Sequence, residues 1–136
     1  MNLYLAHGFA GRHAVRRLQA AVQINCPEIK LINPFYSIER PEMTEIDAGT
    51  RARYDLDPDR VVKHDLTMID RCDGILGIID NNTRYGTPME LWYAADKGMP
   101  TYLLVVNGEQ DHPWLRYIAT SIVTNSEELY ALLRNL

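Results

Sequence analysis

The chain has 136 residues, of which 46% are hydrophobic and 24% are charged, and its formal net charge is −4. This length accommodates one domain, which we expect to span residues 1–136, and the composition is ordinary for a soluble globular protein. No basic cluster is present, which argues against a nucleic-acid partner, although a small anionic ligand can still bind where the local charge is positive.

The N-terminus and the two cysteines favour a cytoplasmic protein. The opening LYLAHGF lacks the basic region and long apolar run of a signal peptide, and no apolar stretch reaches the length of a membrane span. We interpret Cys26 and Cys72 as free thiols in a reducing compartment.

The expected elements of the first half begin with a short apolar strand at 3–7. Apolar residues from Ala14 to Val22 then recur at helical spacing, and a second strand follows at 29–33. Residues 34–59 form a long polar segment, of the kind that is often functional. Asp57 and Pro58 form an N-cap and N1 pair that begins the next helix.

The second half continues the alternation. The run GILGII at 74–79 is expected to be a strand buried on both faces. A helix from about Pro88 to Lys97 ends at Gly98, and residues 101–106 form another buried strand. Residues 121–125 form an edge strand, and Ser126 caps a last helix.

This alternation predicts an α/β fold with helices on both faces of a parallel sheet. We expect a single-domain, flavodoxin-like, doubly wound, five-stranded parallel sheet. Ligands of such sheets bind beyond the carboxyl ends of the strands, near the switch in strand order. The segments to search therefore follow the first, third and fourth strands, and they read AHGFAGR, DNNTRYGTPME and NGEQDHPW.

Glu90, in the second of these segments, has two interpretations. Thr87, Pro88 and Glu90 have the spacing of a capping box, in which the glutamate serves only the helix terminus. Alternatively, Glu90 is a reagent, because it lies at the ligand-binding edge and Asp65 can supply a second carboxylate. Two carboxylates in different environments are the usual equipment for chemistry at a glycosidic carbon.

The chain resembles the nucleoside 2-deoxyribosyltransferase family, which includes the 2′-deoxynucleoside 5′-monophosphate N-glycosidases. The matching pieces are LYLAHGF, HDLTMIDRCDGILGIID and YGTPMELWYAADKGMPTYLLV, in the family's order and approximate spacing. The resemblance implies that an N-glycosidic bond is cleaved and that the sugar passes to another base or to water. It also implies a homodimer or higher homo-oligomer with shared active sites.

Three catalytic roles follow from the resemblance. Glu90 matches the nucleophile that forms a covalent deoxyribosyl-enzyme, and Asp65 matches the aspartate that assists proton transfer at the base. Tyr4 matches the tyrosine that orients the nucleophile.

The resemblance also implies a set of substrate-binding residues. Gly8 and Phe9 match the first ligand-contacting loop, and Phe35 and Tyr36 would stack on the base. The other residues that we expect to bind the substrate are His7, Arg12, Asp80, Arg84, Gly86, Met89 and Trp114. Trp114 and Arg116 are candidates for the residue that this family lends to a neighbouring subunit's site.

Arg84 departs from the family's pattern, in which an acidic group or a small hydroxyl residue tends to stand at this place. A guanidinium favours phosphate through a bidentate fork, and Arg12 can add a second positive group. We therefore hypothesise a 5′-monophosphate substrate. The alternative is that Arg84 is an ordinary surface-loop arginine.

Other functions of the same fold are less well supported. A receiver domain would use Asp80, but it needs an acidic pair after the first strand, where this chain has Ala6 and His7. A non-catalytic nucleotide sensor would keep the pocket without needing both Glu90 and Asp65. The four histidines lack ligand spacing, so we expect no metal, and the absence of G-x-G-x-x-G argues against a dinucleotide cofactor.

Overall fold

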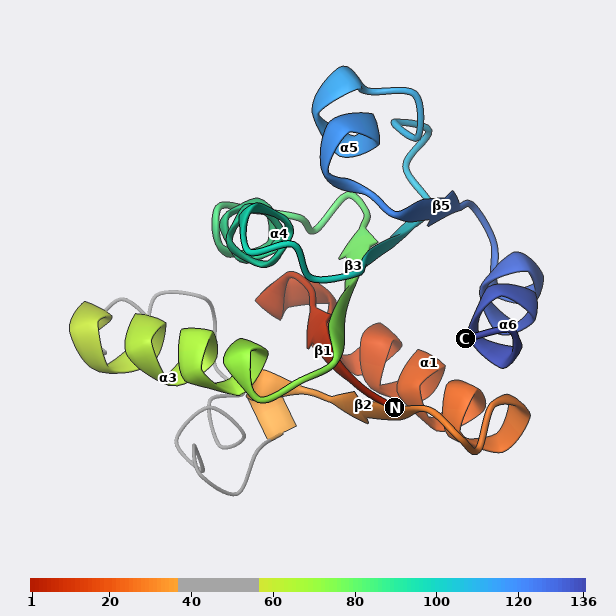
Figure 1. Ribbon diagram of the computed structural model, residues 1–136, viewed down its shortest axis with the longest axis horizontal. Helices are drawn as coiled ribbons and strands as arrows, with labels where there is room; N and C mark the ends of the chain where they lie inside the picture. The colour runs from red at the N-terminus through yellow and green to blue at the C-terminus, as the bar shows by residue number, and fades with distance from the viewer. Residues whose placement is uncertain (37–56) are drawn as a thin grey trace.

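A computed structural model describes residues 1–36 and 57–136 and places them around one five-stranded parallel sheet (Figure 1). The strands are β1 (Asn2–Ala6), β2 (Lys30–Ile32), β3 (Gly74–Ile79), β4 (Thr101–Val105) and β5 (Ser121–Val123). The α-helices are α1 (Arg12–Asn25), α3 (Pro58–Asp70), α4 (Gly86–Asp96), α5 (Pro113–Ile118) and α6 (Ser126–Arg134). Two short 3-10 helices, η1 (Phe9–Gly11) and η2 (Pro34–Tyr36), follow β1 and β2. Most of the long segment expected at 34–59 lies outside the described residues.

The strand order is β2-β1-β3-β4-β5, and every neighbouring pair is parallel. The predicted flavodoxin-like, doubly wound sheet is therefore confirmed. The order reverses between β1 and β3, because the chain first adds β2 on one side of β1 and then crosses to the other side. The carboxyl ends of β1 and β3 are consequently the expected ligand-binding edge.

Alternate side chains of β1 enter two separate cores, because successive residues of a strand point to opposite faces. Leu3 and Leu5 pack with apolar residues of α1 and α6, which cover one face of the sheet (Figure 1). Tyr4 and Ala6 belong to the other core, with residues of α3 and α4. All six residues of β3 are buried, as expected for a strand covered on both faces.

The starts of three helices test the predicted caps. The Asp57 side chain accepts a hydrogen bond from the Asp59 amide at 3.1 Å, so this cap is confirmed. The prediction that Ser126 caps α6 is wrong by one residue, because the Asn125 side chain accepts from the Glu128 amide at 2.9 Å.

The capping-box interpretation of Thr87, Pro88 and Glu90 does not hold in the structure. The helix begins at Gly86, its N-cap Tyr85 makes no capping hydrogen bond through its side chain, and Thr87 lies inside the helix. Thr87 is buried, so its side chain packs into the interior instead of standing at the helix terminus. Glu90 therefore lies one turn into the helix, where it does not serve as the N3 residue of a capping box.

Helix α4 lies close to the sheet because β3 has a glycine beneath it. A Cβ atom at Gly77 would lie 2.7 Å from Leu91 Cδ2, closer than Cβ atoms approach other atoms in folded proteins, and 3.1 Å from Leu103 Cδ2, a tight contact. Leu91 is fully buried and directly follows Glu90 in the helix. The contact between Gly77 and Leu91 thus sets how near Glu90 comes to the strands.

Both cysteines are free thiols among the described residues. Cys26 is buried. At Cys72, burial first and the charge of Asp73 second raise the pKa of the thiol to about 11, so it stays protonated near neutral pH. Among the helices that the structure describes, none is long and apolar enough to cross a membrane.

We expect Gly77→Ala to lower the free energy of unfolding by about 1–3 kcal/mol, because the added methyl group overpacks a filled core. Urea denaturation of the purified variant measures this loss. Gly86→Ala is the matched control, since a Cβ there would meet only Glu90 Oε1, at 3.8 Å, and should change stability by less than about 1 kcal/mol. Equal stability of the Gly77 variant and the wild type would contradict the close packing.

Candidate active site

The structure joins Tyr4 and Glu90, which are far apart in the sequence. Tyr4 is fully buried on β1, and its hydroxyl donates a hydrogen bond to Glu90 Oε2 of α4. Glu90 itself is half-buried. One carboxylate oxygen is thus bound to a tyrosine on β1, next to the central strand β3, so a tertiary contact orients the glutamate.

Close contact between two loops builds the edge of the sheet next to this pair. A Cβ atom at Gly8 would lie 2.2 Å from the Asn82 carbonyl oxygen. Only glycine therefore fits where the loop after β1 meets the loop after β3. Asp80 shapes the third loop, since its Oδ1 accepts from the Asn82 amide at 2.8 Å and its own amide donates to Thr83 Oγ1 at 2.9 Å. The loops that follow β1 and β3 are therefore in close backbone contact at this edge of the sheet.

A buried polar group lies where the first loop meets the end of β2. His7 Nε2 lies 3.0 Å from Asn33 Oδ1, and His7 Nδ1 lies 3.2 Å from the Gly8 carbonyl oxygen. Burial is the main influence on this imidazole and lowers the pKa of His7, against the opposing effects of the Asn33 and Gly8 hydrogen bonds and the Asp80 charge. His7 is thus expected to be neutral near pH 7.

Aromatic rings cover this polar group. The Phe35 ring meets the His7 ring edge-on at 4.9 Å and the Phe9 ring edge-on at 5.3 Å, measured between centroids. The Arg16 guanidinium carbon lies 4.5 Å from the centre of the Tyr36 ring. His7 and Phe9 are buried, while Phe35 and Tyr36 are partly exposed, so the latter two are the accessible aromatic residues here.

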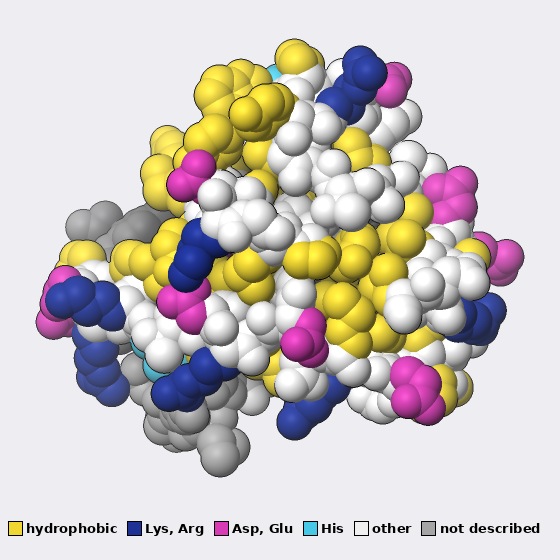
Figure 2. Space-filling model, in the orientation of Figure 1, with side chains coloured by type: hydrophobic (Ala, Val, Ile, Leu, Met, Phe, Trp, Pro, Cys, Tyr) yellow, Lys and Arg dark blue, Asp and Glu magenta, His cyan; other side chains and the backbone are white. Residues whose placement is uncertain are grey.

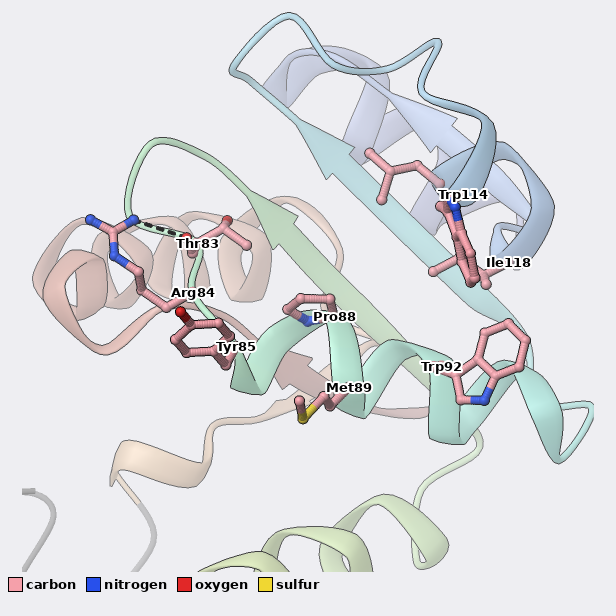
Figure 3. Close-up of a pocket in the computed structure, with 9 residues that line it drawn as sticks. Thr83, Arg84, Tyr85, Pro88, Met89, Trp92, Trp114 and Ile118 are labelled. Carbon is pink, nitrogen blue, oxygen red and sulfur yellow. Dashed lines mark hydrogen bonds between the residues drawn. The ribbon is translucent and has the colours of Figure 1, made fainter. Parts of the chain in front are cut away.

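Arg12 and Arg84, the two residues that we expect to bind a phosphate, each donate hydrogen bonds to backbone carbonyls. Arg12 Nη1 donates to the Phe9 carbonyl at 3.2 Å, and its guanidinium lies 4.0 Å from the centre of the Phe9 ring. Arg84 Nη1 donates to the Asn81 carbonyl at 3.1 Å and to the Thr83 carbonyl at 2.9 Å, and Figure 3 shows the bond to Thr83. Both bonds use the same nitrogen, Nη1, of the exposed Arg84 guanidinium.

Asp65 lies on α3 and is partly buried. Its Oδ1 lies 3.3 Å from His64 Nδ1, which is its neighbour in the sequence. The structure therefore gives Asp65 a partner on its own helix, and its role as a proton donor stays a prediction.

An apolar cavity of about 720 Å³ lies between α4 and α5, and Glu90 is not among the residues that line it. Met89 and Trp92 of α4 line it together with Trp114 and Ile118 of α5 (Figure 3). The surface over α4 and α5 is rich in hydrophobic side chains (Figure 2). Trp114 is 66% exposed and Tyr117 is 79% exposed, so two large aromatic side chains of α5 are in contact with solvent.

Apart from Asp65 on α3, the predicted site residues fall into two groups. The first lies at the carboxyl edge of β1 and β3 and in the neighbouring loops, and comprises Tyr4, His7, Gly8, Phe9, Arg12, Phe35, Tyr36, Asp80, Gly86 and Glu90. Arg84, Met89 and Trp114 belong to the second, which lines the cavity between α4 and α5.

Sequence reasoning missed Asn33, which lies between His7 and Phe35, and Asn82, against which Gly8 packs. Asn33 had a usable signal, because an asparagine before a proline at a strand end often bonds to the backbone two residues on. The described residues contain no group of three or more His, Cys, Asp or Glu that could hold a metal ion.

Neither a protein-family model nor a curated protein matches the sequence. Solved structures do match. A 2-deoxyribosyltransferase from the psychrotolerant bacterium Bacillus psychrosaccharolyticus is 22% identical, with a TM-score of 0.68 over 98% of this chain and 96% of that chain. The CMP N-glycosidase BcmB of Clostridium botulinum is 16% identical, with a TM-score of 0.60 over 100% of each chain. These likenesses show a shared fold, and the resemblance indicated by the sequence motifs is confirmed at that level.

The buried imidazole predicts a pH dependence of stability. Because the pKa of His7 is lowered in the folded state from its ordinary value of 6.5, the unfolded chain binds a proton more readily. The free energy of unfolding should therefore fall as the pH drops below about 6.5, by up to about 1.4 kcal/mol per pH unit.

Urea denaturation between about pH 7.5 and 5 measures this slope. His7→Gln should remove it, and His13→Gln, which changes an exposed histidine, should keep it. The same slope in wild type and His7→Gln would show that another group is responsible.

Proposed function

We propose that the chain is a member of the nucleoside 2-deoxyribosyltransferase family that cleaves the N-glycosidic bond of 2′-deoxynucleosides or their 5′-monophosphates. The observation that carries this proposal is the hydrogen bond from Tyr4 to Glu90 at the switch point of the sheet. The fold shared with a 2-deoxyribosyltransferase and with a CMP N-glycosidase supports it.

In the proposed reaction, Glu90 attacks the anomeric carbon of the sugar. A carbon–oxygen bond forms to the carboxylate as the bond to the base nitrogen breaks, through an oxocarbenium-like state that the carboxylate stabilises. The leaving base takes the bonding electron pair and a proton, which Asp65 supplies. Water or a second base then attacks the same carbon, releases Glu90, and returns a proton to the site.

Tyr4 prepares the nucleophile in this scheme. Its hydroxyl binds one carboxylate oxygen and restricts rotation of the Glu90 side chain. A fixed carboxylate loses less conformational entropy when it reaches the reacting carbon. The buried strand that carries Tyr4 makes this orientation rigid.

The substrate would lie along the edge formed by the loops after β1, β2 and β3. Phe35 and Tyr36 would stack on the base, and Gly8, Asp80, Gly86 and Met89 would approach the sugar. Arg84 and Arg12 would bind a 5′-phosphate. The oriented Arg84 fork supports a monophosphate, because a guanidinium binds phosphate through two parallel hydrogen bonds.

We also propose a homodimer or higher homo-oligomer that buries the apolar surface of α4 and α5. Trp92 packs there against both Trp114 and Tyr117, with ring centroids 6.0 Å and 6.2 Å away. Large exposed aromatic clusters are typical of protein interfaces. In such an assembly Trp114 or Arg116 would be close to a neighbouring site. The cytoplasm remains the proposed location.

Purified protein should release free base from deoxynucleosides or their 5′-monophosphates, which chromatography of timed reactions with and without a second base detects. Glu90→Gln should lower the rate on the order of 10⁴-fold or more, because a covalent nucleophile is lost. Mass spectrometry of quenched reactions should show a deoxyribosyl adduct that Glu90→Gln lacks. Glu28→Gln, before β2 at the opposite edge of the sheet, is the control.

The same substrate panel tests the phosphate. Arg84→Gln should raise KM for the monophosphates roughly 10- to 100-fold, as loss of a charged hydrogen bond does, and leave KM for the nucleosides unchanged. Arg134→Gln on α6 is the matched control. Equal effects on both substrate classes would reject the phosphate role. Nucleotide binding without any turnover would instead favour the non-catalytic sensor.

Sedimentation velocity should report a dimer or larger species for the purified chain. Trp114→Glu should shift the population toward the monomer, because a charge is placed in a buried apolar interface. Ile24→Glu, which alters an 80% exposed residue on α1, should leave the distribution unchanged. A wild-type monomer at high protein concentration would contradict the proposal.

A further inference from the structure

Two buried polar side chains connect the first loop to the end of β2. His7 is 3% exposed and Asn33 is 5% exposed, and each follows directly on a strand. Burying two polar side chains is unfavourable unless their hydrogen bonds are satisfied, so the partners of His7 and Asn33 decide what this pair can do.

The orientation of the Asn33 amide is fixed from both ends. Its Oδ1 accepts from the Phe35 backbone amide at 3.1 Å, and its Nδ2 donates to Gln19 Oε1 at 3.1 Å. Gln19 is itself oriented, because its Nε2 donates to the Leu31 carbonyl at 3.0 Å. If the Asn33 amide were rotated by 180°, its NH2 group would face the Phe35 backbone N–H, and two donors would oppose each other. The Asn33 oxygen must therefore be the atom that faces Phe35 and His7.

This orientation determines what His7 does. Asn33 Oδ1 carries no hydrogen, so His7 Nε2 is the donor in the 3.0 Å contact. The other ring nitrogen faces the Gly8 carbonyl, which is also an acceptor. The neutral ring can therefore donate to only one of its two partners, and donation to Asn33 ties the loop after β1 to the loop after β2.

The same pair controls the position of an aromatic ring. Asn33 holds the Phe35 backbone amide, and the His7 ring meets the Phe35 ring edge-on, with an angle of 83° between the planes. Phe9 contacts a further edge of Phe35 at 77°. Both the backbone and the ring of Phe35 are thus constrained by residues that are themselves buried.

We propose that His7 and Asn33 are positioning residues that set the Phe35 ring for stacking on the base of the substrate. This inference rests on the proposed function, since it assigns the base to Phe35. It also gives His7 an indirect role, because its buried side chain supports the wall of the site from behind.

A purely structural role for the pair would predict lower stability with no selective effect on ligand binding. A positioning role predicts that substitutions act through Phe35 alone. Double-mutant cycles distinguish the two, because residues that act through one another have non-additive effects.

The experiment measures dissociation constants of dAMP, dGMP, dCMP and TMP by calorimetry, in protein that carries Glu90→Gln so that no turnover occurs. Phe35→Ala should weaken binding roughly 5- to 150-fold, the usual effect of losing one stacking aromatic ring. His7→Leu should weaken binding at least about fivefold in the Phe35 background, and by less than about twofold when Phe35 is already alanine.

Rescue supplies the second readout. His7→Gln places an amide donor near the position of Nε2 and should bind within about twofold of the parent, whereas His7→Leu cannot donate to Asn33. Asn33→Leu should resemble His7→Leu. Thermal unfolding of each variant confirms that the binding differences are measured on folded protein.

Several outcomes would overturn the inference. One is additive effects of His7→Leu and Phe35→Ala, and another is binding by His7→Gln as weak as by His7→Leu. The inference would also be overturned if none of the four nucleotides bound. Because binding is measured without turnover, a failed cleavage assay rejects only the proposed reaction, while an additive cycle rejects only the positioning role.

Discussion

One hydrogen bond, from the Tyr4 hydroxyl to Glu90, connects strand β1 to helix α4, which begins at the ligand-binding edge. It depends on two features of packing. Tyr4 faces the α3 and α4 side because alternate residues of β1 enter different cores. Helix α4 lies close enough because Gly77 leaves room for Leu91. A carboxylate positioned in this way is oriented before any ligand arrives, which is the basis of the proposed chemistry.

Much of the fold could be predicted because its signals are local. The apolar run of β3, the alternation of strands and helices, and the Asp57–Pro58 cap each depend on neighbours in the sequence. The start of α4 could not be predicted in the same way. Thr87, Pro88 and Glu90 have capping spacing, but burial of Thr87 and the bond from Tyr4 assign these residues to tertiary contacts instead. The local sequence pattern favoured a cap at Thr87, but long-range packing determined where the helix begins.

In the candidate site, too, some residues could be predicted from sequence motifs and others depend on tertiary contacts. The ordered motifs identified the Tyr4 and Glu90 positions, and the structure brings these residues together. The His7–Asn33 contact escaped notice because nothing in the spacing of two residues on different strands indicates that they meet. It becomes visible only when β1 and β2 pair in parallel and their carboxyl ends coincide. Polar groups that support a site from behind are therefore harder to find in a sequence than those that line it.

The α4–α5 cavity has a pharmacological consequence. Its volume of about 720 Å³ falls within the range of small-molecule sites, and its lining is mainly apolar. Met89 directly precedes Glu90 in α4 and Trp92 lies two residues after it, and both line the cavity, whereas Glu90 accepts the hydrogen bond from Tyr4. A ligand bound there would contact Arg84 and Met89, which the proposed function assigns to the substrate, while Glu90 is not among the residues that line the cavity. It would lie between α4 and α5 and would compete with the proposed assembly of two chains through this surface.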